Sequence, residues 1–356
     1  MSSDSNASDF ELGAMILAAG RGERLRPLTS VRAKPACPIG NWPLIWYALR
    51  FVRRQGYEAV AVNLHHLSGS IRRALAPAQA WGLAVHAVEE PVLLGTGGGP
   101  RALCDRFGAG PLLLLNGKLL LGGDLQAARR RHLESGAAAT LFVWPNLDPM
   151  RYTRLLWDES TNRLERFSFA RERRPNGAEP EGWMFTGVQF LSPALLERLP
   201  AGAPSDLVTG LYVPLLREGA LIRIEPFPGP WCEVSDPGAY LGAHQWLLDG
   251  RLGAHGPALT AGNCVAEEVS IDSSAELSRC TVGRRSVVRA RARLERSVLW
   301  EDVEIGSGCE LRDAIVTAGA QLPEGCRMER QIALAGPNGG LQFFPLDSGI
   351  TRRGAG

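Results

Sequence analysis

Two glycines, an arginine and a lysine follow the first apolar run of the chain and form a group with an evident chemical use. Residues 14–19 are short and apolar, as in a buried parallel strand, and Gly20 and Gly22 come directly after them. Backbone N–H groups of a glycine-rich loop can approach phosphate oxygens because no side chain is in the way. Arg24 and Lys34 can neutralise the phosphate charge. The segment therefore predicts a phosphate-binding loop.

A second glycine-rich segment lies at residues 94–99. Glycine lets a backbone come close to a flat ligand, so Gly95, Thr96, Gly97 and Gly98 are candidates for contact with a nucleobase. The same composition is also compatible with a flexible hairpin that has no ligand.

The elements that must position these loops alternate along the first 250 residues. Apolar runs predict strands at 14–19, 59–63, 84–88, 111–115 and 139–144, and amphipathic stretches predict helices at 43–55, 70–76, 99–104 and 125–135. This alternation is typical of an α/β domain with a mostly parallel sheet and helices on both faces. We expect that domain to span residues 13–250.

After residue 258 the periodicity changes. Aliphatic residues recur six apart, with a step of five after every third one, so the whole set repeats every 17 residues. The set is Val265, Ile271, Leu277, Val282, Val288, Leu294, Leu299, Ile305, Leu311, Val316, Leu322 and Met328. Three short strands per coil with one inward aliphatic residue each predict a short left-handed parallel β-helix over 258–333. We expect a disordered tail at 1–12 and a C-terminal tail at 334–356.

The complete string of residues 20–35 resembles the signature of the sugar-1-phosphate nucleotidyltransferases, G-x-G-x-R-L-x-P-L-T-x(4)-K-P. Residues 94–98 resemble that family's L-G-T-[GA]-G segment, and residues 185–187 resemble its sugar-side loop. Within that family the chain resembles the mannose-1-phosphate guanylyltransferases and the related heptose and muramate phosphate nucleotidyltransferases. The resemblance implies a Rossmann-like domain that joins a nucleoside triphosphate to a sugar 1-phosphate and releases pyrophosphate.

The resemblance also implies roles for individual residues. Arg24 would meet the leaving pyrophosphate, Lys34 would contact phosphate, and Thr186 and Gly187 would contact the sugar. The nucleotide would be bound by Leu17, Ala18, Ala19, Gly20, Gly22, Gly95, Thr96, Gly97, Gly98 and Asn116.

The sequence departs from this family at the metal site. The family holds Mg²⁺ with two aspartates, one in an N-G-D segment and one in a W-x-D segment, because Mg²⁺ prefers carboxylate oxygens. Here the first segment reads Asn116-Gly117-Lys118, and the second carries Glu233. Lys118 would repel the ion, so we expect Lys118 to act as a fixed cation in the site, with Glu233 as a weak metal ligand. Asp124 or Asp236 could take over ligation.

Three functions stay open at this point. The first is a nucleotidyltransferase with an altered metal site, and the second is a catalytically impaired homologue that binds a nucleotide or nucleotide sugar and regulates a partner. The third, an acyltransferase of the β-helix class, is disfavoured because there are only about four coils, with His255 before the first one. The motifs fix neither the base nor the sugar.

Composition excludes several other classes. The formal net charge is +2, so nothing calls for nucleic acid or an anionic membrane, and no apolar run has membrane-spanning length. Seven cysteines without metal spacing and no recognisable signal peptide predict a cytoplasmic protein. We expect a homo- or hetero-oligomer formed through the β-helix. A run of arginines at 284–296 would be solvated or would meet an acidic partner.

Overall fold

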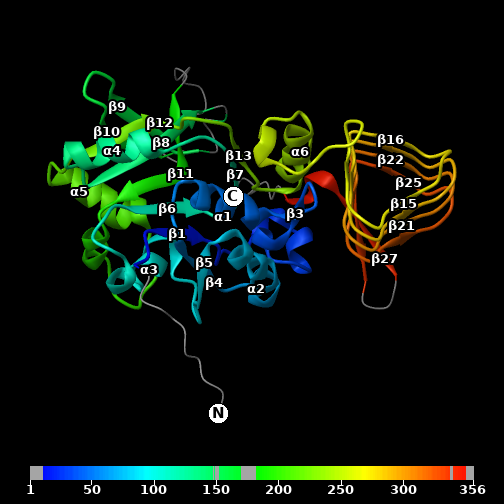
Figure 1. The fold of residues 1–356 in the computed structure, drawn as a ribbon, viewed down its shortest axis with the longest axis horizontal. Coiled ribbons are helices and arrows are strands. Elements are labelled where there is room, and N and C mark those ends of the chain that lie inside the picture. The colour runs from blue at the N-terminus through cyan, green and yellow to red at the C-terminus, as the bar shows by residue number, and fades with distance from the viewer. Residues whose placement is uncertain (1–10, 147, 149–151, 170–181, 337–339, 350–356) are drawn as a thin grey trace, which may run out of the picture.

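The computed structural model describes residues 11–146, 148, 152–169, 182–336 and 340–349. An α/β part comes first in the chain, and a stack of short strands follows it and lies at one side of it (Figure 1). Most of the expected N-terminal tail, and residues 350–356 of the C-terminal one, lie outside the described residues.

The α/β part is built on a nine-stranded sheet with the order β5-β4-β1-β6-β11-β8-β12-β10-β9. The strands are β1 (Ala14–Leu17), β4 (Ala59–Leu64), β5 (Ala84–Glu89), β6 (Leu112–Asn116), β8 (Ala139–Pro145), β9 (Arg154–Asp158), β10 (Arg163–Ser168), β11 (Trp183–Leu191) and β12 (Ile222–Pro226).

The sheet is mixed, and the expectation of a mostly parallel sheet is corrected here. Strands β4, β5 and β6 join β1 in parallel, and β12 runs parallel to β8. Strand β11 lies between β6 and β8 and runs antiparallel to both, and the β9–β10 pair is also antiparallel. For the β9–β10 pair the reason is local: only residues 159–162 join the two strands, whereas parallel neighbours need a crossover of about a dozen residues or more.

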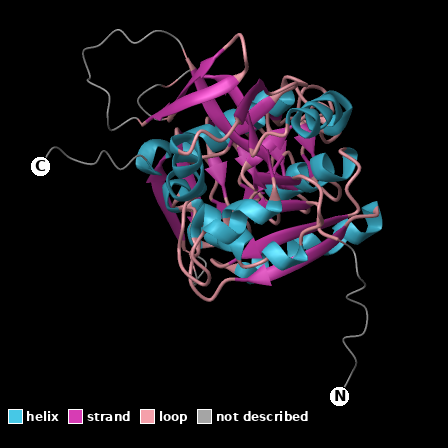
Figure 2. Cartoon of the chain, turned by 90° about the vertical axis from the view of Figure 1, so that its left-hand side faces the viewer, coloured by secondary structure: helices cyan, strands magenta, loops and turns pink. Residues whose placement is uncertain are grey.

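Helices cover both faces of this sheet (Figure 2). Because side chains alternate along a strand, Ala14 and Ile16 of β1 enter one core while Met15 enters the other. The first core is covered by α1 (Leu44–Arg54), α2 (Ser68–Leu75) and α4 (Gln126–Ser135). The second core is covered by α5 (Val213–Arg217) and the helical turns Pro193–Arg198 and Val208–Tyr212.

Two elements outside this sheet matter for the site. Helix α3 (Gly95–Arg101) begins four residues earlier than the predicted helix at 99, so the second glycine-rich segment is its first turn. A small antiparallel sheet joins β7 (Leu119–Leu121) to β13 (Trp231–Glu233), and helix α6 (Pro237–Leu248) follows β13.

The C-terminal part is a stack of 17-residue coils, as the spacing predicts, and its parallel sheets are consistent with a left-handed β-helix. Val282 pairs with Leu299 and Val288 with Ile305, so equivalent residues of successive coils lie in register. The three faces of the stack contain strands β14 (Cys264–Val265), β17 (Thr281–Val282), β20 (Val298–Leu299) and β23 (Ile315–Val316); β15 (Ser270–Ile271), β18 (Val287–Val288), β21 (Glu304–Ile305) and β24 (Gln321–Leu322); and β16 (Glu276–Ser278), β19 (Arg293–Glu295), β22 (Glu310–Arg312) and β25 (Arg327–Glu329).

The segment expected as a C-terminal tail is structured in its described residues up to Gly349. Strand β26 (Gln331–Ala335) extends the first face, and β27 (Leu341–Pro345) pairs antiparallel with it before a 3₁₀ turn over Leu346–Gly349. The 17-residue period continues into β26, where Ile332 pairs with Ile315, but β27 runs antiparallel and follows no such spacing, so the sequence pattern did not predict it.

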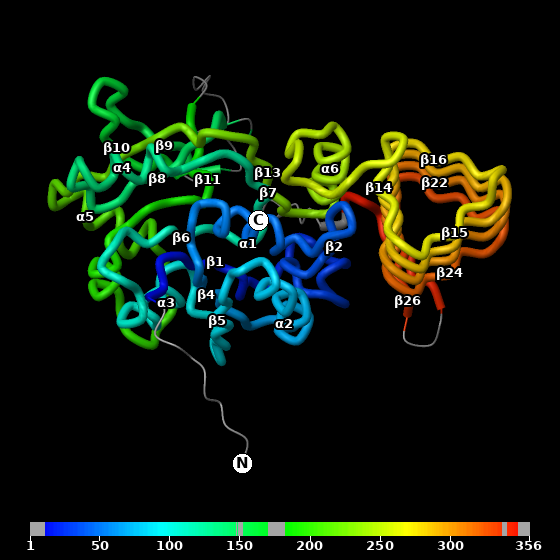
Figure 3. The backbone as a smooth tube through the Cα atoms, viewed as in Figure 1, coloured from blue at the N-terminus to red at the C-terminus, as the bar shows by residue number. Residues whose placement is uncertain are grey.

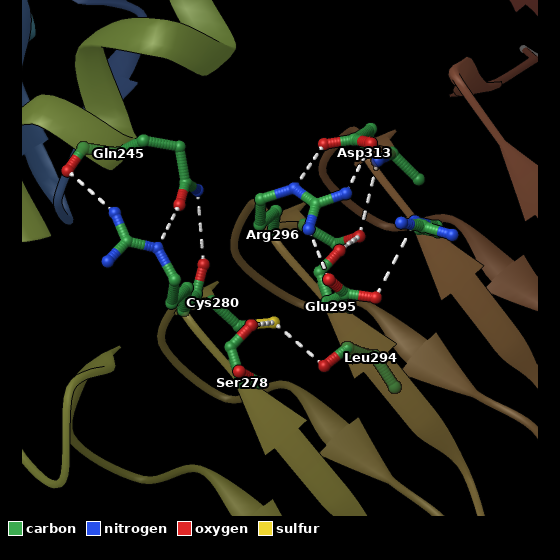
Figure 4. Close-up of polar contacts among 11 residues, drawn as sticks. Gln245, Ser278, Cys280, Leu294, Glu295, Arg296 and Asp313 are labelled. Carbon is green, nitrogen blue, oxygen red and sulfur yellow. Dashed lines mark hydrogen bonds and ion pairs between the residues drawn. The ribbon is translucent and has the colours of Figure 1, made fainter.

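Five of the six arginines in the run at 284–296 form ion pairs within the stack itself. Arg285 donates to both carboxylate oxygens of Asp302, at 2.6 and 2.7 Å. Arg296 donates to both oxygens of Asp313 at 2.8 Å (Figure 4). Each of these two arginines lies one coil, or 17 residues, before its partner. These contacts favour the outward, solvated reading of the run over an acidic partner.

The stack packs on the α/β part through a shared apolar core. Trp300 is 1 % exposed and lies in one cluster with Leu25, Leu28 and Tyr240. The indole N–H of Trp300 donates to the Tyr240 hydroxyl at 2.9 Å, and Arg32 forms an ion pair with Glu301. The loop after β1 is therefore clamped between the sheet and the β-helix.

Candidate nucleotide site

A cleft of about 590 Å³ opens at the carboxyl ends of β1 and β6, where parallel strands of such sheets usually hold ligands. It is lined by Leu17, Ala18, Ala19, Gly20, Arg21, Gly22, Glu23, Arg24, Lys34, Pro35, Asn63, Leu93, Gly95, Thr96, Asn116, Gly117 and Lys118. The two glycine-rich segments, 75 residues apart in the sequence, thus face one cavity, as expected for a nucleotide site.

The first glycine-rich loop, residues 20–22, is fixed by a hydrogen bond on its protein side and is open on the side that faces the cleft. Gly22 has a φ of 66°, a left-handed conformation that glycine adopts without strain, and its carbonyl accepts a hydrogen bond from Thr29 Oγ1 at 2.9 Å. A Cβ added to Gly20 would meet nothing within 4 Å, because this residue faces the open cleft. The loop is therefore both fixed and accessible to a ligand.

A buried polar chain links the two loops and was not predicted from the sequence. Asn63 Oδ1 accepts from the Ala18 N–H at 2.7 Å, and Asn63 Nδ2 donates to Glu90 Oε1 at 2.7 Å. Glu90 Oε2 in turn accepts from the Leu94 N–H at 3.0 Å. Asn63 and Glu90 are 3 % and 4 % exposed, so every one of these groups depends on the others for hydrogen bonding. The chain fixes the distance across the cleft.

The second loop is shaped by a neighbouring segment, residues 203–207. Gly97 N–H donates to the Ser205 carbonyl at 2.9 Å, and Thr96 Oγ1 donates to Asp206 Oδ2 at 2.8 Å. A Cβ on Gly97 would lie 2.8 Å from Ser205 Oγ, and one on Gly98 would lie 2.7 Å from the Ala203 carbonyl. Gly97 and Gly98, predicted as nucleotide contacts, do not line the cleft; they make room for protein backbone. Gly95 and Thr96 do line it.

The small β7–β13 sheet brings together the two residues that depart from the family pattern. Glu233 pairs with Leu119 across this sheet, and the Val234 N–H donates to the Lys118 carbonyl at 3.0 Å. The side chains then meet: Lys118 Nζ donates to Glu233 Oε1 at 2.8 Å. Their side chains are 29 % and 9 % exposed, so this ion pair is partly withdrawn from water.

Positive charge dominates the floor of the cleft. Lys34 Nζ donates to the carbonyls of Val234 and Ser235 at 3.2 and 2.9 Å. Burial, together with the nearby cations Lys118 and Arg24, lowers the pKa of Lys34 to about 8. Burial would raise the pKa of Glu233, but the charge and hydrogen bond of Lys118 outweigh it, and the pKa lies below its usual value. Glu233 is therefore ionised, with its charge already matched by Lys118.

A smaller cavity of about 240 Å³ adjoins the cleft, and Arg24, Asn116 and Lys118 line both. Thr186, Gly187, Phe185 and Glu233 also line it. Thr186 Oγ1 donates to the Phe142 carbonyl at 2.7 Å, so its hydroxyl is committed to the protein. Gly187 has a φ of 77°, and the side chain of Asn116 occupies the space of a Cβ there. The predicted sugar-side residues thus border the predicted nucleotide site.

The residues present do not fit a Mg²⁺ ion of the kind that the family generally uses. Glu233 is the one carboxylate among the described residues lining the smaller cavity, and this carboxylate already forms an ion pair with the ammonium group of Lys118. Asp236 is engaged as the N-cap of α6, where its Oδ1 accepts from the Ala239 N–H at 2.9 Å. Asp124 is exposed at the start of α4, and neither aspartate lines either cavity. Within the described ranges, no group of three His, Cys, Asp or Glu side chains could hold a metal.

Comparison with known proteins agrees with the fold of both parts of the chain. Residues 13–247 match the nucleotidyl transferase family model, and residues 253–332 match the model of a GlmU-like C-terminal hexapeptide domain. A UTP--glucose-1-phosphate uridylyltransferase of Synechocystis sp. is 24% identical over 85% of this chain and 86% of its own length. A mannose-1-phosphate guanylyltransferase of Mycobacterium tuberculosis is 25% identical over 84% and 82%.

A shorter relative matches the first part of the chain. The N-acetylmuramate alpha-1-phosphate uridylyltransferase of Neisseria meningitidis is 31% identical over 54% of this chain and 81% of its own length. In the part of the chain that the structure describes, none of the helices has the length and hydropathy for a membrane crossing. The sheet, the two glycine-rich loops, the coils and these matches together place this chain in the nucleotidyl transferase family, with a hexapeptide-repeat domain at its C-terminal side.

Proposed function

We propose that the cleft binds a nucleoside triphosphate or a nucleotide sugar, with the sugar in the smaller cavity, and that the Lys118–Glu233 ion pair stands in the place of the catalytic metal. The observation that carries this proposal is the 2.8 Å contact between Lys118 Nζ and Glu233 Oε1 at the point where the two cavities meet.

The charge at this point supports direct phosphate binding. Arg24, Lys34 and Lys118 all line the cleft, while Glu233 offsets one of these cations. Phosphate oxygens would meet the bare N–H groups of residues 20–22 and these side chains, with charge-assisted hydrogen bonds. A divalent ion beside Lys118 would be repelled by several kcal/mol, since two unit charges ~4 Å apart cost about 4 kcal/mol at an effective dielectric constant of ~20.

The nucleotidyl transfer reaction of the family would use the same arrangement of the two cavities. It would also need more positive charge to compensate the phosphates in the transition state. A phosphate oxygen of the sugar 1-phosphate attacks the α-phosphorus, and the bond to pyrophosphate breaks. Lys118 is a single positive charge that is already paired, so it stabilises the transition state less than a divalent ion would. We therefore propose much slower turnover than in relatives that keep both aspartates.

A regulatory role is the second candidate function, and the packing of the phosphate loop against the β-helix favours it. Loop residues Leu25 and Leu28 share a core with Trp300 of the β-helix, so ligand binding at the loop and the position of the β-helix would be coupled. A protein that binds without turnover could transmit occupancy of the cleft to a partner by this route.

The test is pyrophosphate release from GTP and UTP with a panel of sugar 1-phosphates, for the wild type and for Lys118→Asp. Nucleotide binding is measured by calorimetry on the same samples, with and without Mg²⁺. The wild type is expected to bind with an affinity that Mg²⁺ does not increase, and to release little pyrophosphate. Lys118→Asp is expected to make binding dependent on Mg²⁺ and to increase turnover.

Lys118→Met is the matched control, because it removes the cation without adding a ligand. It should weaken binding of the phosphates and gain no Mg²⁺ dependence. Fast Mg²⁺-dependent turnover by the unmodified chain would contradict the proposal. Absence of nucleotide binding in both the wild type and Lys118→Asp would contradict the assignment of the cleft itself.

A further inference from the structure

The first coil of the β-helix is the uncovered end of the stack. In the second and third coils the inward residues Val288 and Ile305 are 1 % and 0 % exposed, whereas the equivalent Ile271 in the first coil is 38 % exposed. Val265 and Leu277, on the other two faces, are only half-buried. The apolar centre of the stack therefore opens to the surface at this end.

The backbone is equally incomplete there. Strands β14, β15 and β16 are the first strands of their three sheets, and within the described part of the chain each has a strand neighbour on one side only. Figure 3 shows the coils as a stack of rings that ends at the first coil, drawn in yellow. Strand edges with free N–H and C=O groups readily accept another strand.

The opposite end of the stack is closed. The equivalent residues of the fourth coil, Leu322 and Met328, are 3 % and 2 % exposed, and Leu341 of the β26–β27 hairpin packs against that core. A solenoid needs a cap at each end to cover its apolar centre. Among the residues that the structure describes, one such cap is present, at the C-terminal end of the stack.

The rim of the open end is acidic. Glu267, Glu268, Asp272 and Glu276 all lie in the first coil, and residues 264–278 contain no lysine or arginine. One column along the stack alternates in charge: Glu276, Arg293, Glu310 and Arg327 lie in register. If a further strand were added beyond Glu276, the alternation of this column would place a basic side chain there.

The first coil also repeats the charges of the third one. Glu268 and Glu276 occupy the columns of Asp302 and Glu310, two coils earlier. Asp302 is bound by Arg285 of the second coil, at 2.6 and 2.7 Å. At the open end Glu268 is already bound by Arg284 of the second coil, and Glu276 lies 3.6 Å from Arg293 Nε. A strand with the character of the second coil would therefore share these carboxylates with the arginines below them, as Arg296 and Arg312 share Glu295.

We propose that the open end of the β-helix is a docking surface for a basic, aliphatic extended segment of a partner protein, which adds one more rung of strands to the first coil. Aliphatic side chains of this segment cover Val265, Ile271 and Leu277, and its basic side chains meet Glu268 and Glu276. Main-chain hydrogen bonds to the strand edges supply the rest of the affinity. This inference does not depend on the function of the cleft.

A groove of about 420 Å³ beside the open end extends the same surface. It lies between the first coil and the β2–β3 hairpin (Pro38–Ile39 and Trp42–Pro43), and is lined by Trp42, Val265 and Glu267 among others. A second copy of this chain fits the surface poorly, because two open ends would place acidic rims against each other.

A synthetic peptide tests the proposal. The probe is residues 281–295 of this chain, labelled with a fluorophore; it omits Arg296, whose column at the open end holds Arg279. Anisotropy with the full-length protein is expected to show saturable binding that weakens with salt. The double variant Glu268→Arg, Glu276→Arg should weaken it ~10-fold, because each exposed ion pair contributes up to about 1 kcal/mol.

Matched controls separate docking from general charge attraction. Glu329→Arg alters an exposed glutamate at the closed end and should leave peptide affinity unchanged. Ile271→Lys should abolish binding while the circular dichroism spectrum and thermal transition stay those of the wild type, since this side chain is already partly exposed.

Three results would overturn the proposal. They are a lack of saturable binding, equal binding by the charge-reversed variant, and a dimer in sedimentation velocity that Ile271→Lys dissociates. The last result would mean that a second copy covers the open end instead.

Discussion

At the scale of single residues, the site depends on polar groups that satisfy one another behind the cleft. Asn63 binds both loops at once, through the Ala18 N–H and through Glu90. It reaches the cleft wall itself, but its amide oxygen and its amide nitrogen each already form a hydrogen bond with a protein group. Its contribution to binding is therefore to hold the phosphate loop in place rather than to contact the ligand strongly.

Replacing Asn63 by alanine tests this positioning role. The change leaves a buried N–H of Ala18 and a buried Glu90 carboxylate without their partner, and each unsatisfied group costs about 1–3 kcal/mol. We expect a fall of ~2–4 kcal/mol in the free energy of unfolding, measured by urea denaturation. Nucleotide affinity, measured by calorimetry well below the melting temperature, should also fall. Unchanged stability would contradict the hydrogen-bond chain.

The sequence located most residues of the cleft but not this chain of contacts. Gly20, Gly22 and Arg24 belong to a continuous signature, so a local pattern was enough to find them. Asn63 and Glu90 lie 27 residues apart, each at the end of an apolar strand, and no local feature distinguishes them from surface polar residues. The Lys118–Glu233 contact joins residues 115 apart, and only the β7–β13 pairing shows that the two side chains touch.

At the scale of elements, glycine has two different tasks in the two loops. In the first loop, Gly20 keeps the cleft open, and no protein atom lies within 4 Å of the position of its Cβ. In the first turn of α3, Gly98 lets the backbone of residues 203–205 approach. Composition alone does not distinguish these tasks, which is why Gly97 and Gly98 were expected to contact the ligand together with Gly95.

Alanine substitutions should separate the two tasks. Gly98→Ala would place a Cβ 2.7 Å from the Ala203 carbonyl, so α3 and that segment must move apart. We expect a loss of stability of ~1–3 kcal/mol, as for other overpacked positions, together with weaker binding. Gly20→Ala should leave the thermal transition unchanged and still weaken nucleotide binding. Calorimetric affinities and melting curves of both variants check this.

Gly242→Ala is the control for the alanine substitution itself. Gly242 lies inside α6, away from the cleft, and a Cβ there meets nothing within 4 Å. This change should raise the free energy of unfolding by up to ~1 kcal/mol through helix propensity and leave nucleotide affinity unchanged. If Gly20→Ala bound nucleotide as well as Gly242→Ala does, the first loop would not be the phosphate-binding element.

At the scale of elements, the periodicity of the sequence predicts where strands and helices lie but not the order of the strands in the sheet. Apart from α3, the helices and the strands of the main sheet up to β8 were predicted closely, because apolar runs and amphipathic stretches are local properties. The short strands β2, β3 and β7 were not predicted. Strand β11 lies between β6 and β8 and is antiparallel to both. This position depends on the packing of the whole sheet and not on the local sequence. The β-helix was more predictable, since its pairing partner is always the residue 17 positions away.

At the scale of the whole molecule, the β-helix and the α/β part form one body around the phosphate loop. Their contact includes Trp300 with Tyr240 and the Arg32–Glu301 ion pair. It also includes His244 of α6, fully buried, whose Nδ1 lies 2.9 Å from Thr281 Oγ1 of the second coil. Acid should therefore act on this junction.

The pH dependence of stability follows from the pKa of His244, which burial lowers to about 3 from an ordinary value of 6.5. Between these two values the unfolded chain binds a proton that the folded chain does not. Stability is therefore retained above pH 6.5 and falls as the pH decreases through this window, by about 1.4 kcal/mol per pH unit. Below about pH 3 both states are protonated, and this contribution no longer changes.

Carboxylates that pair with arginines along the β-helix, such as Asp302 and Asp313, also titrate in acid. The variant His244→Gln therefore isolates the contribution of His244 to the pH dependence of stability. Glutamine can still hydrogen-bond with Thr281 but does not titrate. Urea unfolding at pH 7 and pH 5 should show a larger loss for the wild type than for His244→Gln, by ~2 kcal/mol over this interval. Equal pH slopes for the two proteins would mean that folding does not lower the pKa of His244, and that this residue does not contribute to the acid sensitivity of the junction.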